Sequence, residues 1–340
     1  FTPTAICGPA RASLVTGVLP FRHGLVANAE LGAGQARELG DMYPSFAWAL
    51  RDVGYRVHHV GKWHVGAKRG PEAFGFEGVH YDGWENPVEH HTYSAWLAER
   101  GLPPFRLSDE VRLPAHDGKP GRLLAGIVEQ PTEATFDAFL ADQAIDQLRD
   151  LAETWHTSRQ PFYLGVHWFG PHLPYCIPRE WFERFDTGSV ELPGSIAETF
   201  AGKPRVQKSY SEYWGFDSLS LDTWRRLIAA YHGYVAMIDA QIQRIVDAVK
   251  CLGLWDSTAL LFTADHGEFT GSHRLHSKGP AMYDDIYRIP LIARLPGAPA
   301  HRIESRLASL LDVTPTVLDL AGAPIPEHMD GCSLVPLTRG

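Results

Sequence analysis

The chain has 340 residues, of which 44% are hydrophobic and 21% are charged. These proportions are typical of soluble globular proteins and exclude a disordered chain. Its 40 acidic residues outnumber its 31 basic ones, and the net charge of −9 argues against nucleic acid or an anionic membrane as a partner. Four cysteines without a C-x-x-C pair are too few for a disulfide scaffold. The 17 histidines indicate metal or proton-transfer chemistry, or simply packing.

Hydrophobic periodicity predicts helices that alternate with strands along the chain. Proline at the first position and glycine just beyond the end delimit the first helix, and the most regular helical period lies in residues 221–252. The expected helices are 9–15, 44–53, 133–155, 221–252 and 313–320. The expected strands are 55–60, 162–167, 259–263 and 291–295.

This alternation predicts an α/β fold with a mostly parallel, mixed central sheet and helices on both of its faces. Ligands of such sheets bind beyond the carboxyl ends of the strands, so the loops at that edge are the place to look for a site. Two segments, 66–130 and 185–220, are rich in Pro, Gly and polar residues, and we expect them to be surface insertions that wall the pocket.

Three of the predicted strands lead into loops with reactive side chains. The first is followed by Gly-Lys-Trp-His with Lys62 and His64, and the second by Gly-Pro-His-Leu-Pro with His172. The third is followed by Asp265-His266-Gly-Glu, with Lys278 shortly after. Taken alone, the first is compatible with a solvated loop, the second with a rigid turn and the third with the cap of a turn. Three such loops at one sheet edge predict a common site.

Asp265 and His266 offer an oxygen and a nitrogen ligand for a divalent cation. Two adjacent ligands do not complete a metal site, so further ligands must come from other parts of the chain.

The segment from Cys7 to Gly17 is the most specific feature of the sequence. Cys7 directly precedes the predicted first helix, where free N–H groups and the helix dipole favour an anion. Arg11 follows about one turn later and can reach the same anion with its forked guanidinium. The pattern is compatible with a thiolate nucleophile of lowered pKa, or with a buried cysteine beside a helix start.

This segment resembles the activation motif of the sulfatases, C-x-P-x-R-x-x-x-x-T-G, with all of its fixed residues present. The Gly-Lys-Trp-His, Pro-His-x-Pro and Asp-His-Gly-Glu loops follow in the order found in sulfatases, as does the segment that starts at Lys278. The resemblance runs from residue 1 to about residue 334. It implies the alkaline-phosphatase-like sulfatase fold and hydrolysis of a sulfate ester.

The resemblance also implies a modified nucleophile. A formylglycine-generating enzyme would oxidise Cys7 to formylglycine, whose hydrate attacks sulfur with one hydroxyl and releases sulfate by deprotonation of the other. Arg11, Lys62 and His64 would hold this hydrate, with His64 as a candidate base.

The remaining loops carry the other implied roles. His172 and Lys278 would grip the sulfate and protonate the leaving oxygen. Asp265, His266 and the side chain derived from Cys7 would bind a divalent metal, with Ca²⁺ expected first and Mn²⁺ or Mg²⁺ as alternatives. Many sulfatases have Asn where this chain has His266. Related phosphonate monoester and phosphodiester hydrolases share the His variant, so these activities are the alternative.

Two departures from the family pattern concern the ends of the chain. Sulfatases have an Asp-Asp pair of metal ligands upstream of the cysteine motif, whereas this chain begins at Phe1, and we do not transfer the role to Asp284-Asp285. The family also continues into a smaller C-terminal subdomain, whereas this chain stops at Gly340. We therefore expect one catalytic domain over residues 1–340, without the first strand and C-terminal subdomain, that binds metal weakly and turns over slowly.

The substrate is expected to be a carbohydrate sulfate or a small alkyl or aryl sulfate. Trp84, His90, His91 and Tyr93 are expected at the pocket entrance, where they would stack on a sugar or face a cation such as choline; the alternative is that they pack a local core. A non-enzymatic alternative is an inactive homologue that binds sulfated ligands. Neither asparagine lies in a glycosylation sequon, which is compatible with a protein of the bacterial cytoplasm or periplasm.

Overall fold

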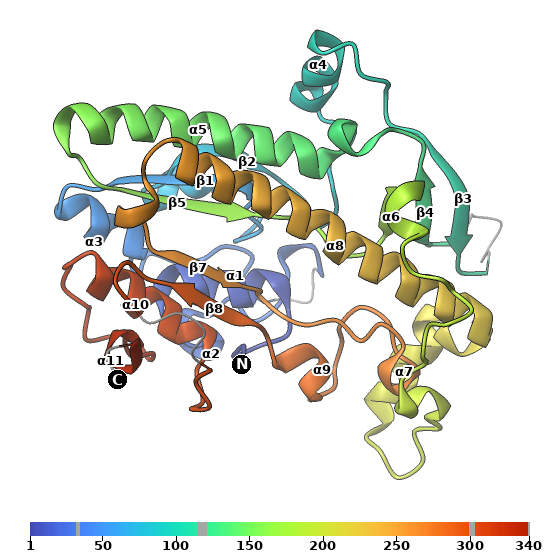
Figure 1. Ribbon diagram of the computed structural model, residues 1–340. Helices are drawn as coiled ribbons and strands as arrows, with labels where there is room; N and C mark the ends of the chain where they lie inside the picture. The colour runs from blue at the N-terminus through green and yellow to red at the C-terminus, as the bar shows by residue number, and fades with distance from the viewer. Residues whose placement is uncertain (32–34, 115–120, 299–302, 339–340) are drawn as a thin grey trace.

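The structure of the protein is a computed structural model that describes residues 1–31, 35–114, 121–298 and 303–338 (Figure 1). Its α-helices are α1 (Cys7–Thr16), α2 (Pro20–His23), α3 (Phe46–Asp52), α4 (His91–Glu99), α5 (Phe136–Ser158), α6 (Arg179–Phe182), α7 (Arg205–Trp214), α8 (Leu221–Cys251), α9 (Asp284–Tyr287), α10 (Val313–Leu320) and α11 (Val335–Thr338). Its strands are β1 (Arg56–Lys62), β2 (Glu77–Tyr81), β3 (Leu107–Arg112), β4 (Leu123–Val128), β5 (Phe162–His167), β6 (Tyr175–Pro178), β7 (Leu260–Thr263) and β8 (Leu291–Arg294).

A parallel sheet of order β2-β1-β5 forms the middle layer of the molecule (Figure 1). Side chains alternate between its faces, so Val57 and Val60 of β1 point in opposite directions. Val57 packs in a cluster with α1, α3 and α10, while Val60 packs in a second cluster with α5. The central strands are therefore buried on both faces, as in other α/β folds.

The two long helices pack against each other. Leu148 and Ala152 of α5 contact Val249 near the end of α8, and both helices cover the same side of the sheet in Figure 1. Ser220 caps α8 by accepting a hydrogen bond from the N–H of Thr223, which satisfies one of the free donors at the helix start. None of the helices in the described ranges combines the length and the apolar character needed to cross a bilayer.

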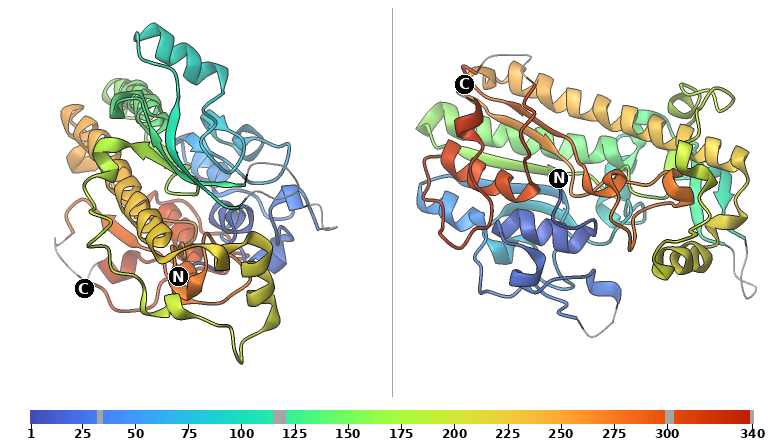
Figure 2. Two further views of the ribbon diagram at one scale, coloured as in Figure 1. Left: turned by 90° about the vertical axis from the view of Figure 1, so that its right-hand side faces the viewer. Right: turned by 90° about the horizontal axis from the view of Figure 1, so that it is seen from below.

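Two smaller sheets complete the architecture. β3, β4 and β6 form one of them, and Tyr175 and Ile177 of β6 pack against Trp224 of α8. Figure 2 shows this sheet at the end of the molecule away from α3 and α10. That sheet is mixed, because β3 and β4 pair antiparallel while β4 and β6 pair parallel. β7 and β8 pair antiparallel in a sheet of their own.

The N-terminal and C-terminal segments of the chain lie side by side and brace α1. The amino group of Phe1 donates to the carbonyl of Ala308 at 2.7 Å, and the N–H of Leu310 donates to the carbonyl of Phe1 at 2.8 Å. Ala10 of α1 packs against Leu310 and Val313. The hydroxyl of Thr314 also donates to the carbonyl of Leu14 in α1, so segments 300 positions apart in the sequence hold the helix that carries Cys7.

The predicted α/β class is confirmed, and the strand at 162–167 and the helix at 313–320 have the expected bounds. The range 66–130 differs from the expected surface insertion, because it contributes β2 to the central sheet and β3 and β4 to the second one; its residues 115–120 lie outside the described part. β2 reads Glu-Gly-Val-His-Tyr, and this short edge strand shows no clear hydrophobic period. Segment 185–220 contains α7, a short helix with a mostly exposed face.

Gly61 lies next to Lys62 in β1 and allows the backbones of β1 and β5 to approach closely. Its φ of 105° is in a region that favours glycine, and an added Cβ would lie 2.1 Å from the carbonyl oxygen of His167. We expect Gly61→Ala to lower the free energy of unfolding by about 3 kcal/mol, from backbone strain plus displacement of β5. Urea denaturation measures this loss.

Gly54→Ala is the matched control for this prediction. Gly54 has a φ of 90°, but an added Cβ would meet no atom of the described residues within 4 Å, so only backbone strain of about 1 kcal/mol is expected. Equal losses in the two variants would contradict a steric role for Gly61.

Candidate active site

Cys7 is the first residue of α1, and its side chain is buried. The helix was expected to begin at Pro9; it begins two residues earlier because Ile6 is the extended residue that precedes it. The free N–H of Gly8 in the first turn donates to Oδ1 of Asn28 at 2.9 Å. The hydrogen bond to Asn28 therefore holds the N-terminus of α1, and Cys7 with it, in a fixed position.

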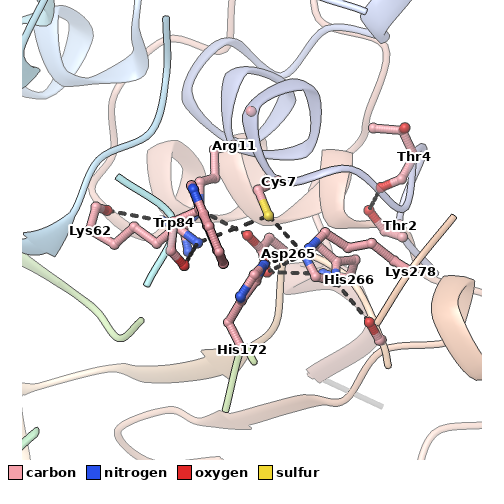
Figure 3. Close-up of polar contacts among 12 residues, drawn as sticks. Thr2, Thr4, Cys7, Arg11, Lys62, Trp84, His172, Asp265, His266 and Lys278 are labelled. Atoms are coloured by element: carbon pink, nitrogen blue, oxygen red, sulfur yellow. Dashed lines mark hydrogen bonds and ion pairs between the residues drawn. The ribbon is translucent and has the colours of Figure 1, made fainter. Parts of the chain in front are cut away.

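The cysteine sulfur lies between two nitrogen atoms from separate segments of the chain (Figure 3). Nε2 of His266, after β7, is 3.1 Å from Sγ, and Nζ of Lys62, at the end of β1, is 3.9 Å from it. Lys62 is buried and also donates to the carbonyl of Trp84 at 3.2 Å. The end of β1 and the loop after β7 therefore meet at Cys7.

Arg11 contacts the site from the next turn of α1. Its Nε donates to Oδ2 of Asp265 at 2.8 Å, and its Nη1 donates to the carbonyl of Lys62 at 2.9 Å. In the described contacts, Arg11 is thus directed to Asp265 and the end of β1. This geometry lets Arg11 hold the Asp265 carboxylate in a fixed orientation.

Cys7, Asp265 and His266 form a group with one potential metal-ligand atom each, all within 4.8 Å of one another. Nδ1 of His266 lies 2.8 Å from the carbonyl of Gly267, which can only accept, so Nδ1 carries a proton. In the neutral ring Nε2 is then the free ligand atom, an orientation common among metal-binding histidines. The donor set of an oxygen, a nitrogen and the group at position 7 fits a divalent cation.

The charges around this group favour anions. Burial opposes ionisation of Cys7, but Lys278, Lys62 and His266 outweigh it and bring the pKa of the thiol well below its ordinary value. Burial likewise opposes ionisation of Asp265, and Arg11 outweighs it, so the pKa of this carboxyl is also lowered. Burial lowers the pKa of Lys62 to about 8. The site therefore stabilises negative charge at Cys7.

His172 and Lys278 form a second pair beside the sulfur (Figure 3). Nδ1 of His172 is 2.7 Å from the carbonyl of Leu173, so Nδ1 is the donor and Nε2 accepts from Nζ of Lys278, also at 2.7 Å. Burial, followed by the charge of Lys278, lowers the pKa of His172 to about 4. A neutral imidazole thus accepts a hydrogen bond from an ammonium group.

His64 lies in the loop after β1, but its side chain has a different partner from the one expected. Nε2 of His64 is 2.9 Å from Oε1 of Glu30, and no hydrogen bond joins it to Cys7 in the described part of the chain. Its Nδ1 is buried and has no partner among the described residues. The structure therefore brings together Cys7, Arg11, Lys62, His172, Asp265, His266 and Lys278, with His64 held to one side by Glu30.

A cavity of about 630 Å³ lies next to this cluster and has His172 in its wall. Trp84 and His90 line it, in agreement with their expected place at the pocket. The other two expected residues do not: the fully buried Tyr93 packs in a core with Phe136, and His91 is exposed outside the lining. Tyr93 is on the buried face of α4, so its core alternative is the correct one.

The sequence did not indicate which groups contact Lys62, Gly8 and His64 and hold them in position. The carbonyl of Trp84, the amide of Asn28 and the carboxylate of Glu30 contact Lys62, Gly8 and His64, respectively. A backbone carbonyl has no sequence signature, and Asn28 and Glu30 lie in a loop without a recognisable pattern. Asp137, a buried carboxylate in the lining of the cavity, did carry a signal, because it falls on the apolar stripe of a predicted helix, three, four and seven residues before Leu140, Ala141 and Ala144.

An α/β fold in which a buried cysteine, two lysines and an Asp-His pair meet concentrates positive charge around one side chain, an arrangement suited to a tetrahedral oxyanion. The chain belongs to the sulfatase family, because the family model described as Sulfatase matches residues 1–323. This confirms the family that the cysteine motif indicates, within the alkaline phosphatase superfamily.

Two curated relatives match all or nearly all of the chain. It is 31% identical over 352 residues to a choline-sulfatase of Rhizobium meliloti (strain 1021), covering 100% of this chain and 64% of that protein. It is 27% identical over 363 residues to the multifunctional alkaline phosphatase superfamily protein PehA of Trinickia caryophylli, covering 97% of this chain and 66% of that protein. The chain thus spans somewhat less than two thirds of these relatives.

Solved structures show the same fold. The phosphonate monoester hydrolase SpPMH from Silicibacter pomeroyi matches with a TM-score of 0.75 and 25% identity, covering 98% of this chain and 67% of that one. A structure of BT4656 in complex with D-glucosamine-2-N,6-O-disulfate matches with a TM-score of 0.70 and 20% identity, covering 99% and 71%. The second likeness concerns the fold alone.

Proposed function

We propose that this protein hydrolyses a sulfate ester, with a formylglycine derived from Cys7 as the nucleophile. The observation that carries the proposal is the position of the Cys7 sulfur, 3.1 Å from Nε2 of His266 and 3.9 Å from Nζ of Lys62, within a complete C-x-P-x-R motif. Conversion by a formylglycine-generating enzyme would supply an aldehyde whose hydrate offers one hydroxyl for attack and a second for release of sulfate.

The residues around Cys7 have separate tasks in this proposal. Lys62 and Lys278 neutralise the charge on the sulfate oxygens as it is redistributed in the transition state. The Lys278–His172 pair supplies the proton for the leaving alkoxide, since the Lys278 ammonium donates along a 2.7 Å hydrogen bond at the edge of the cavity. Arg11 orients Asp265, and His64 remains a candidate base for the release of sulfate.

A divalent metal belongs to the proposal. Asp265, His266 and the modified side chain at position 7 would hold it, and Ca²⁺ is the first candidate, with Mn²⁺ or Mg²⁺ as alternatives. The ion would supply Lewis-acid stabilisation of the reacting oxygens. The salt bridge from Arg11 keeps Asp265 ionised, which is the form that a cation requires.

Phosphonate monoester or phosphodiester hydrolysis is the second candidate. It is supported by His266 and by the likeness to SpPMH, at 25% identity over 98% of this chain. Sulfate and phosphate esters present similar tetrahedral oxyanions, so the cationic cluster around Cys7 suits both. The proposed sulfate substrates are small alkyl or aryl sulfates or sulfated saccharides.

Two measurements test the proposed function. Peptide mass spectrometry after co-expression with the activating enzyme should show the mass loss of a thiol-to-aldehyde conversion at Cys7. A panel of para-nitrophenyl sulfate, a para-nitrophenyl phosphodiester and a phenyl phosphonate monoester should then give the highest kcat/KM for the sulfate. A higher kcat/KM for either phosphorus ester would favour the second candidate, and an unmodified, inactive protein that binds sulfate would favour a binding role.

A further inference from the structure

The loop that carries Lys278 is held by a contact from a distant part of the chain. Lys278 lies between the 3-10 turn Ser272–Arg274 and α9, in a segment without helix or strand. The one hydrogen bond that its backbone makes with the described residues comes from α7, where the hydroxyl of Tyr210 donates to the carbonyl oxygen of Lys278. Because no helix or strand fixes this backbone, its position depends on that contact.

Tyr210 lies on the face of α7 that packs against the rest of the protein. Gln207, Tyr210 and Trp214 are three and four residues apart, so they share one side of the helix. Gln207 is buried, and Tyr210 and Trp214 pack against the core cluster that contains Phe216. The rings of Tyr210 and Phe216 meet edge to face, with their centroids 6.0 Å apart. This packing holds the Tyr210 hydroxyl in a fixed position toward Lys278.

Both ends of α7 are anchored to loops that border the site. At its C-terminal end, the guanidinium carbon of Arg122 lies 4.4 Å from the ring centroid of Trp214 and 4.8 Å from that of Trp84. Such cation–π contacts strengthen when the cation is withdrawn from water. At its N-terminal end, the side-chain oxygen of Gln207 accepts a hydrogen bond from the hydroxyl of Tyr283 at 3.0 Å. The helix that carries Tyr210 is therefore fixed relative to the reaction centre.

The Tyr210 hydroxyl is a stable donor for this contact. Burial raises the pKa of Tyr210, so the hydroxyl stays protonated at neutral pH. The tyrosine ring also lies directly against the residue after Lys278, because a Cβ added at Gly279 would be 2.7 Å from Cζ of Tyr210. Glycine at position 279 thus allows the close approach that the hydrogen bond requires.

Lys278 is held at both of its ends by this arrangement. Its carbonyl accepts from Tyr210, and its Nζ donates to Nε2 of His172 at 2.7 Å. A group that transfers a proton must lie within about 3 Å of the receiving atom. A displacement of about 1 Å in such a group can lower a rate by about 100-fold. The place of the Lys278 backbone therefore bears on the rate at which its ammonium group can give up a proton.

We propose that Tyr210 is a positioning residue, which holds the ammonium group of Lys278 within reach of the leaving oxygen of the ester. This inference rests on the proposed function, in which the Lys278–His172 pair supplies the proton for the leaving group. Tyr210 acts through Lys278 and takes no part in bond cleavage. Removal of its hydroxyl should therefore slow those esters most that depend on protonation of the leaving oxygen.

Two aryl sulfates with different leaving groups test the inference. Para-nitrophenolate leaves readily without a proton, whereas the more basic phenolate of phenyl sulfate needs one. We expect Tyr210→Phe, which removes only the hydroxyl, to lower kcat for phenyl sulfate about 10-fold and kcat for para-nitrophenyl sulfate about 2-fold or less. Tyr213→Phe is the matched control, because Tyr213 belongs to the same helix but is 80% exposed, and it should change neither value.

A double-mutant cycle distinguishes positioning of Lys278 from a general disturbance of the fold. Lys278→Met removes the ammonium group and should slow phenyl sulfate more than para-nitrophenyl sulfate. In this background, Tyr210→Phe should lower neither kcat further, because the group that it positions is absent. Equal losses for the two esters in Tyr210→Phe would overturn the inference and leave the sulfatase function intact. An undiminished loss in the Lys278→Met background would also overturn it.

Failure of the proposed function gives a different result. Hydrolysis of phosphonate monoesters alone, with the same leaving-group dependence in Tyr210→Phe, would contradict the sulfatase function and support the inference. If no ester is hydrolysed, calorimetric titration with sulfate measures the position of Lys278. The affinity should then fall about 5-fold in Tyr210→Phe but not in Tyr213→Phe, and equal affinities would overturn the inference.

A second variant displaces the Tyr210 ring from the opposite side if Tyr210→Phe does not fold. The Cβ of Gly279→Ala would push the ring away from the carbonyl of Lys278, so the same leaving-group dependence is expected. Equal losses for the two aryl sulfates in this variant would contradict a positioning role for Tyr210.

Discussion

Replacement of Cys7 by alanine is expected to abolish hydrolysis of the preferred ester, with a loss of about 10⁴-fold or more in kcat. The substitution replaces the CH2–SH group by a methyl group, which cannot be oxidised to the aldehyde, so the proposed nucleophile cannot form. Cys7 is buried at the start of α1, where alanine fits the helix, so the fold should persist. Steady-state kinetics of the matured protein, together with circular dichroism, measure both expectations.

A second cysteine provides the control. Cys251→Ala alters an exposed residue at the end of α8 and should retain full activity. Sulfate binding to Cys7→Ala, measured by calorimetry, should survive because Lys62 and Lys278 remain. Retained hydrolysis in Cys7→Ala would exclude formylglycine as the nucleophile and would direct the search to another residue.

Replacement of Asp265 by asparagine is expected to remove metal binding and, with it, most of the activity. The variant keeps the shape of the side chain but loses the charge that a divalent cation requires, so affinity for Ca²⁺ or Mn²⁺ should fall about 100-fold. It also leaves Arg11 without its carboxylate partner at 2.8 Å, in a pair of which both side chains are largely buried. The free energy of unfolding should therefore drop by about 3 kcal/mol.

Calorimetric metal titration and urea denaturation separate the two effects of Asp265→Asn. Asp284→Asn, which alters an exposed carboxylate in α9, should leave both quantities unchanged. The double variant Arg11→Met, Asp265→Asn should recover part of the lost stability without recovering metal affinity, since it removes the unpaired charge. Unaltered metal affinity in Asp265→Asn would place the cation elsewhere.

The candidate site was predictable where it follows from strand ends and from a short motif. Lys62, His172 and Asp265 come after predicted strands, and parallel strands bring such positions to one edge of a sheet. Cys7 and Arg11 are one helical turn apart, so their proximity is a local property of α1. What these side chains contact was less predictable: Arg11 binds Asp265 across 254 residues of sequence.

The fold was predictable to a similar extent. The long amphipathic helices and the apolar strand at 162–167 have a strong hydrophobic period, and local pattern was sufficient to place them. β2 was missed because Glu77 and Gly78 are exposed edge-strand positions that are stabilised by pairing with β1, a long-range interaction. The place of His64 beside Glu30 depends on loop conformation, which has no sequence period.

The sequence by itself determined the class of this protein: an acidic α/β chain with a complete C-x-P-x-R motif and loops of lysine, histidine and aspartate in the order of the sulfatases. These features are local, so neighbouring residues are enough to specify them. Only the tertiary structure decided that Asp137 lines the cavity beside the cluster around Cys7, with one carboxylate oxygen that has no hydrogen-bond partner among the described residues. Burial and charge complementarity arise from segments distant in sequence, and a linear pattern does not contain them.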